Sequence, residues 1–190
     1  MDKLEVSVTL EDICFEIGQA DADLIQKQVL QLAEFRETER TWQDSSYLQE
    51  LLTAARYFFP EYVLELEGMA RGAQVEYETL LVWNCRGDLP LPDDAIPESA
   101  KHSPEGCTTL LYPAAKSSVA VIAHNEDGPP ELDGHCSWFS VRQENGSKFS
   151  TFHYPGMLPG HTLSVNSHGL VQTNNNFWVD DLQSGIPHWC

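Results

Sequence analysis

The hydrophobic period of this chain changes near its middle, and that change limits the possible folds more than any other feature. Before residue 87, apolar side chains recur at the spacing of amphipathic helices. The two clearest sets are Leu24, Ile25, Val29, Leu32 and Ala33, followed by Leu48, Leu51, Leu52, Ala55 and Phe59. After residue 107 the apolar runs are short and alternate with polar residues, as they do in strands. Helices followed by antiparallel strands predict an α+β fold.

Two further helices are expected before residue 87. Pro60 suits the first turn of a helix, because the N–H that proline lacks has no partner there, and Glu61 favours the same end. We predict that this helix ends at Gly68 or Gly72, since glycine commonly follows the last helical turn. The segment YETLLVWNCRG, residues 77–87, predicts one more short helix.

The second half of the sequence predicts several short strands. TTLLYP and SSVAVIAH are short runs rich in apolar and β-branched residues. Residues 136–154 alternate on both sides of Asn145–Gly146, a pair that favours a tight hairpin turn. Residues 162–177 predict two more strands around Ser167–Gly169.

A proline-rich segment separates the two halves. Residues 87–106, GDLPLPDDAIPESAKHSPEG, contain four prolines and few bulky side chains, so we expect an exposed linker in which chain cleavage is tolerated. The expected organisation is therefore a helical segment over residues 1–86, this linker, and a β-rich region over residues 107–190.

Charge and composition limit the partners that we expect. The chain of 190 residues has 29 acidic and 11 basic side chains, a net charge of −18, which repels nucleic acid and anionic membranes. No apolar run is long enough to span a bilayer. The first residues, MDKLEVSVTLEDICFEIG, do not resemble a signal peptide, so we expect a cytoplasmic protein.

Sequence patterns for metals and cofactors are absent. There is no phosphate-binding glycine loop, dinucleotide fingerprint or calcium loop. The five cysteines are widely spaced without a C-x-x-C pair, and the seven histidines form no spaced pair on an expected helix. We therefore expect neither a metal site nor a cofactor.

The pair Gly106–Cys107, at the end of the linker, suggests a specific reaction. The Cys107 thiol can attack the carbonyl carbon of Gly106, because glycine adopts the strained backbone that such an attack requires. Hydrolysis of the resulting thioester would free the α-amine of Cys107, so that one residue carries a nucleophile and a base. The alternative is that Cys107 is a small structural side chain, as we expect for Cys14, Cys85 and Cys136.

Four ordered motifs resemble the isopenicillin-N acyltransferase family of N-terminal-nucleophile hydrolases. EGCTTLLYPA is similar to the family's cleavage site, and VIAHNEDG, about twenty residues later, to its second motif. LEGMARGAQVEYETLLVWNCRGD resembles the family's pro-segment, and LPGHTLSVNSHGLVQTNNNF resembles a strand pair that ends in an Asn-rich turn. The resemblance extends from about Pro60 to Phe177.

The resemblance implies a fold, a reaction and three catalytic residues. The fold is a four-layer αββα arrangement, and the reaction is self-cleavage between Gly106 and Cys107 followed by acyl transfer from linear amides or acyl thioesters, including acyl-CoA. Cys107 matches the nucleophile and Asp127 the acid that contacts it. Asn176 matches the oxyanion donor, with Asn175 as the other candidate. A turn role is the alternative for Asp127 and for Asn176.

The sequence departs from the family at several positions. His124 stands where many relatives have Arg, Gln or Gly, and Asp88 replaces a Glu. Relatives also continue into a further strand region that completes the oxyanion hole, so we expect a truncated member with an incomplete fold. Such a chain would self-associate or require a C-terminal partner segment. The competing hypothesis is a non-catalytic chain that acts as a binding or assembly partner.

Overall fold

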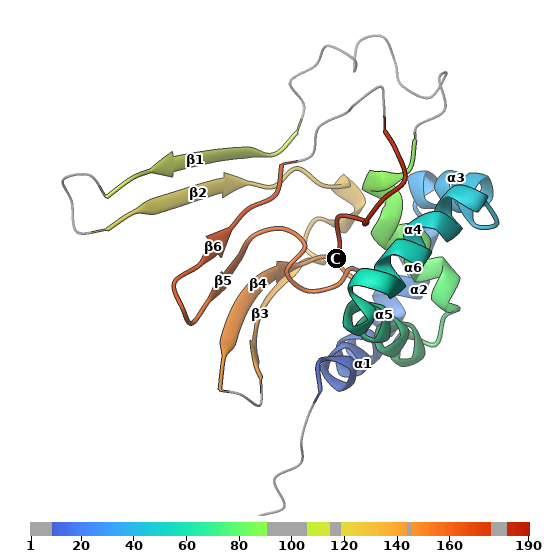
Figure 1. The fold of residues 1–190 in the computed structure, drawn as a ribbon, viewed down its shortest axis with the longest axis horizontal. Helices are drawn as coiled ribbons and strands as arrows, with labels where there is room; N and C mark the ends of the chain where they lie inside the picture. Colours follow the sequence, from blue (N-terminus) through green and yellow to red (C-terminus); the bar gives the residue numbers. More distant parts are fainter. Residues whose placement is uncertain (1–8, 91–105, 115–118, 144–145, 176–181) are drawn as a thin grey trace, which may run out of the picture.

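The structure is a computed structural model that describes residues 9–90, 106–114, 119–143, 146–175 and 182–190. Figure 1 shows helices on one side and strands on the other, so the predicted α+β class is confirmed. The helices are α1 (Leu10–Ala20), α2 (Ala22–Lys27), α3 (Ala33–Trp42), α4 (Ser46–Phe58), α5 (Pro60–Ala73) and α6 (Tyr77–Cys85). Among these described helices, none combines the length and apolar character needed to cross a bilayer.

The apolar set between residues 24 and 33 does not form one continuous helix, and of its five members Ala33 is exposed. α2 ends at Lys27, a 3-10 turn covers Val29–Gln31, and α3 begins at Ala33. Ile25 and Val29 are nevertheless fully buried. The spacing directs these side chains to the core whether or not the backbone between them is α-helical. The first helix, α1, was not predicted, although Thr9 and Asp12 form a capping box at its start.

The predicted end of α5 at Gly68 or Gly72 is wrong. α5 continues through both glycines to Ala73, and Gln74, with φ of 56°, ends it in the left-handed conformation. A Cβ on Gly72 would lie 2.0 Å from the backbone oxygen of Phe15, a residue of α1. Gly68 and Gly72 therefore allow the backbones of α1 and α5 to approach closely, and they do not end the helix.

The described strands form two antiparallel sheets. β1 (Thr108–Tyr112) pairs with β2 (Val121–Asn125), and this two-stranded hairpin projects away from the helices in Figure 1. The second sheet has the order β3 (Ser137–Arg142), β4 (Lys148–His153), β5 (Ser164–Asn166) and β6 (Val171–Gln172). The predicted strand pairs are confirmed, although Asn145 lies outside the described residues. The four-layer arrangement stays a prediction.

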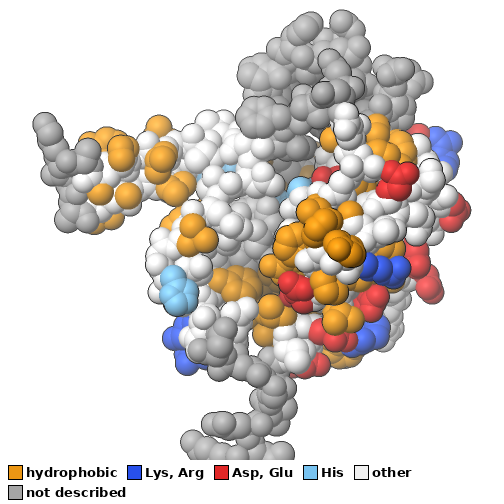
Figure 2. Space-filling view, in the orientation of Figure 1, with side chains coloured by type: hydrophobic (Ala, Val, Ile, Leu, Met, Phe, Trp, Pro, Cys, Tyr) orange, Lys and Arg blue, Asp and Glu red, His pale blue; other side chains and the backbone are white. Residues whose placement is uncertain are grey.

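The projecting hairpin exposes apolar side chains along its length. Every residue of β1 is exposed, and Leu110 and Tyr112 retain 67% and 63% of their accessible surface. Figure 2 shows these side chains as orange atoms along the hairpin. The buried apolar residues instead gather in the helical half, around residues such as Ile25, Leu66 and Trp83.

A buried asparagine joins the helical half to the strands. The side-chain amide of Asn84, in α6, donates to the oxygen of Gly156 at 2.8 Å, and its carbonyl accepts from the N–H of Leu158 at 2.9 Å. The indole of Trp83 donates to the oxygen of Pro155 at 3.1 Å. These bonds fix the segment after β4 against α6.

The contact between α1 and α5 gives a stability prediction. Gly72→Ala should lower the free energy of unfolding by about 2 kcal/mol or more, because the new methyl group overlaps the backbone of α1. The gain of ~1 kcal/mol in helix propensity offsets only part of this cost. Gly185→Ala is the control, since no atom lies within 4 Å of its added Cβ. Equal stability of the two variants in urea unfolding would contradict the close contact.

Glu65, in α5, gives a second prediction because its carboxyl group is buried. It is 7% exposed, and its Oε1 has no hydrogen-bond partner in the described part of the chain. Burial, reinforced by the charge of Glu61, raises the pKa of Glu65 from 4.5 to about 7. The folded state therefore holds this proton more tightly than the unfolded state. The contribution of the protonated Glu65 side chain to the free energy of unfolding is complete below pH 4.5 and is lost as the pH rises through about 7.

Glu65→Gln should therefore raise the free energy of unfolding at pH 8 by up to about 3 kcal/mol, since the amide does not ionise. At pH 4.5 the change should be small, because the carboxyl group is protonated in the folded chain. Urea unfolding at the two pH values measures the difference. A change that is no larger at pH 8 than at pH 4.5 would contradict the raised pKa.

Candidate active site

Cys107 lies directly before β1, after a glycine with an unusual backbone conformation. Gly106 has φ of 153°, a value that L-residues rarely adopt, and open space surrounds its missing Cβ. Cys107 is only partly buried. The predicted cleavage site is therefore next to a strand end, with a backbone at Gly106 that favours glycine.

The thiol of Cys107 lies beside the turn that follows β2. The backbone N–H of Asp127 donates to Cys107 Sγ at 3.5 Å. The Asp127 carboxylate instead accepts from the side chain of Asn125 at 2.7 Å. Burial raises the pKa of the Cys107 thiol, and the negative charges of Glu126 and Asp127 raise it further, while the N–H of Asp127 has the opposite effect. The structure thus brings Cys107 and Asp127 together through the backbone of Asp127.

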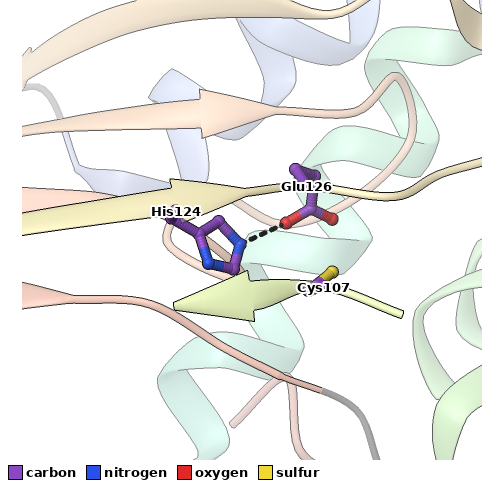
Figure 3. Close-up of side chains that lie close together, drawn as sticks. All are labelled: Cys107, His124 and Glu126. Carbon is purple, nitrogen blue, oxygen red and sulfur yellow. Dashed lines mark hydrogen bonds and ion pairs between the residues drawn. The ribbon is translucent and has the colours of Figure 1, made fainter. Parts of the chain in front are cut away.

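Glu126 is the acidic side chain that faces the thiol, and several donors hold it. His124 Nε2 lies 2.9 Å from Glu126 Oε2, as Figure 3 shows. The hydroxyl of Thr162 donates to the same oxygen at 2.5 Å, and the hydroxyl of Tyr154 donates to Oε1 at 3.2 Å. A carboxylate oxygen of Glu126 also lies within 4.8 Å of Cys107 Sγ. The carboxylate therefore has a fixed orientation next to the thiol.

Asn175 lies on the other side of Cys107. Its side-chain N–H donates to the backbone oxygen of Cys107, and its oxygen accepts from the Thr109 hydroxyl at 2.6 Å. Thr109 also contacts His124 Nδ1 at 2.9 Å and the Thr173 hydroxyl at 3.0 Å. Asn175 thus connects the end of β6 to β1. Asn176, the predicted oxyanion donor, lies outside the described residues.

A cavity of about 510 Å³ opens beside Cys107. Four carboxylates line it, and they belong to Glu34, Asp88, Glu126 and Asp127. Arg86 is the basic side chain in this lining, and its guanidinium lies 4.0 Å above the ring of Trp83. His161 is also in the wall, where burial, followed by the charge of Arg86, lowers its pKa to about 3 and keeps the imidazole neutral. The cavity therefore has an excess of negative charge.

Sequence analysis did not identify Glu126, Tyr154 or Thr162 as site residues. For Glu126 a signal was available, because it lies two residues after His124, and alternate residues of a strand share a face. Tyr154 and Thr162 reach the site from the segment that follows β4, and no local pattern marks them. Among the described residues, the group Cys107, His124 and Glu126 also has ligand atoms within 4.8 Å of one another, close enough to hold a metal ion.

Comparisons with known proteins agree with the family that the motifs predicted. The family model for acyl-coenzyme A:6-aminopenicillanic acid acyl-transferase matches residues 114–190, a range that includes Asp127 and Asn175 and begins after Cys107. The beta-alanyl-dopamine/carcinine hydrolase of Drosophila melanogaster is 31% identical over 155 residues. That alignment covers 72% of this chain and 37% of the relative, so the chain spans well under half of the relative's length. The family prediction is confirmed, and over residues 114–190 this chain belongs to the acyl-coenzyme A:6-aminopenicillanic acid acyl-transferase family.

Proposed function

We propose that this chain is a self-processing amide hydrolase or acyltransferase with Cys107 as its nucleophile. The observation that carries the proposal is the position of the thiol, which lies within 4.8 Å of the Glu126 carboxylate and accepts from a backbone N–H at the edge of a 510 Å³ cavity. The family and the relative are both named for enzymes that act on acyl groups. They do not favour the alternative of a non-catalytic binding or assembly partner.

Maturation begins in this proposal when Cys107 Sγ attacks the carbonyl carbon of Gly106. Glu126 accepts the thiol proton, because its carboxylate lies within 4.8 Å of the sulfur and is held in place by other donors. The bond between the Gly106 carbon and the Cys107 nitrogen then breaks, and the nitrogen takes up a proton as it leaves. Water hydrolyses the thioester and frees both the thiol and the α-amine. Residues 1–86, 87–106 and 107–190 serve as pro-segment, linker and catalytic region.

In the cleaved enzyme the same thiol attacks the carbonyl carbon of an amide substrate. The proposal assigns to Asp127 the positioning of Cys107, which its contact with Sγ supports. An asparagine of the turn after β6 stabilises the oxyanion. Asn176 is the residue matched by the family motif, and Asn175, the other candidate, already donates to the backbone oxygen of Cys107.

The charge of the cavity supports a substrate with a positively charged acyl part. Four carboxylates and one guanidinium line the wall beside Cys107, so a primary ammonium group would be attracted there. The β-alanyl group in the name of the Drosophila relative carries such an amine. Acyl-CoA, with its phosphates, fits this lining less well. We therefore propose linear amides of amino-substituted acids as the substrate class.

Self-cleavage is tested by the intact mass of the purified chain. We expect two pieces that separate between Gly106 and Cys107, and we expect Cys107→Ala to remain whole because no thiolate can form. Cys136→Ala is the matched control, since Cys136 is another partly buried thiol and should not affect cleavage. Cleavage that persists in Cys107→Ala would indicate an external protease and contradict the proposal.

The role of Glu126 is tested by the pH dependence of thiol alkylation in the uncleaved chain. The Glu126 carboxylate raises the pKa of the Cys107 thiol, so Glu126→Gln should move the midpoint of alkylation to lower pH. Asp127→Asn should produce a smaller shift in the same direction, because Asp127 is the weaker of the two causes. Mass spectrometry of the peptide that contains Cys107 measures the labelled fraction. A larger shift in Asp127→Asn would make Asp127 the dominant acid.

A further inference from the structure

Three side chains with different metal-binding atoms meet at the base of the projecting hairpin. The pairing of Thr108 with Asn125 places Cys107 next to Glu126, one position further along the two strands. His124 shares the face of Glu126, two residues earlier in β2. As a result, the sulfur, the imidazole nitrogen and a carboxylate oxygen all lie within 4.8 Å of one another, with the side chains arranged as in Figure 3.

The hydrogen bonds around His124 identify which ring nitrogen can bind a metal. The backbone oxygen of Cys107 only accepts, so Asn175 must turn its N–H to it and its oxygen to Thr109. The single proton of the Thr109 hydroxyl is then donated to Asn175. Thr109 can therefore only accept from His124, and Nδ1 of His124 carries a proton.

The contact between His124 and Glu126 places two potential metal ligands side by side. Nε2 of His124 lies 2.9 Å from Glu126 Oε2. A metal ion bound to both atoms would require this gap to widen to about 3.3 Å. The His124 side chain is 1% exposed, so bulk water does not separate the two groups.

The surrounding residues orient these ligands as outer-shell partners do in metal sites. Thr109 accepts the Nδ1 proton of His124 and thereby directs Nε2 to the gap. The hydroxyls of Tyr154 and Thr162 hold the Glu126 carboxylate. A zinc site with three protein ligands has ligand atoms roughly 3.3–3.7 Å apart at bonds of ~2.0–2.3 Å, and water takes the fourth position. The three ligand atoms lie within 4.8 Å of one another, so small side-chain rotations, which open the His124–Glu126 pair and move the sulfur, would bring all three to that range.

We propose that Cys107, His124 and Glu126 form a binding site for Zn²⁺ that reversibly blocks the Cys107 thiol. Thiolate and imidazole select zinc over magnesium, which prefers oxygen ligands. On binding, the metal replaces the proton of the Cys107 thiol, which is released to the buffer. Coordination to zinc uses the electron pair with which the sulfur would otherwise attack a carbonyl carbon, so the bound thiolate is a weaker nucleophile. The blocking effect rests on the proposed function, whereas zinc binding itself does not.

The test is calorimetric titration of the whole chain with Zn²⁺ under reducing conditions. We expect one zinc ion per chain, with proton release that is detected by repeating the titration in buffers of different ionisation enthalpy. Cys107→Ala, His124→Ala and Glu126→Gln should each weaken binding by more than the ~10–100-fold that loss of an outer-shell partner costs. Mg²⁺ should not bind at this site.

Two control variants show whether the site is the one described. Cys136→Ala and His168→Ala remove a thiol and an imidazole outside the group, and both should bind zinc like the wild type. Co²⁺ gives a second measurement, since at saturating Co²⁺ its thiolate absorption band should be absent from Cys107→Ala and present in His124→Ala and Glu126→Gln. Circular dichroism confirms the folding of each variant, and Glu126→Gln changes the fewest atoms if His124→Ala unfolds.

The outcomes separate the zinc site from the proposed reaction. Absence of stoichiometric binding in the wild type, or equal affinity in Cys107→Ala, would overturn the zinc site whether or not the chain cleaves itself. Slower alkylation of Cys107 in the presence of zinc, reversed by a chelator, would support the blocking effect in the uncleaved chain. Unchanged alkylation with zinc bound would overturn that effect.

Discussion

The geometry of the active site depends on the buried side chain of Asn84. Its amide group bonds to Gly156 and Leu158 at once, and it is fully buried in α6. A buried amide without partners costs ~1–3 kcal/mol, so any displacement of the helical half from the strands is penalised at this point. The indole N–H of Trp83 makes another hydrogen bond to the same segment, at the backbone oxygen of Pro155. The segment after β4 is therefore positioned by the helices and not only by its own sheet.

The same segment determines how the nucleophile is surrounded. Tyr154 precedes the residues that Asn84 holds, Thr162 follows them, and both hydroxyls donate to Glu126. A carboxylate oxygen of Glu126 in turn lies within 4.8 Å of Cys107 Sγ. The helices therefore influence the position of the thiol indirectly. Asn84 holds the segment after β4, and two hydroxyls of that segment hold Glu126 next to the thiol. The helical segment would therefore organise the site before the proposed cleavage.

The sequence predicted structural features correctly where a local pattern of residues can arise from only one kind of structure. Alternation predicted the strand pairs, and the order of helices and strands predicted the α+β class. Contiguous motifs singled out Cys107 and Asp127, which the structure places in contact, while their catalytic roles stay predictions. Gly68 and Gly72 were misread, because a glycine that ends a helix and a glycine that admits a neighbouring helix look alike in one dimension. The contacts of Tyr154 and Thr162 with Glu126 arise only after distant segments pack, so no window of the sequence contains them.

The two ends of the hairpin formed by β1 and β2 differ in how easily their strands can separate. Its outer end, near Tyr112, has little apolar cover, so opening there costs little free energy. Its inner end is fastened by the bonds from Thr109 to Asn175 and Thr173 and by the contacts of Glu126. Opening of the strands near Tyr112 would therefore leave the bonds at the inner end in place, and Cys107 would keep its neighbours. Cys107 thus lies at the boundary between an exposed part of the hairpin and the part that is bonded to the rest of the molecule.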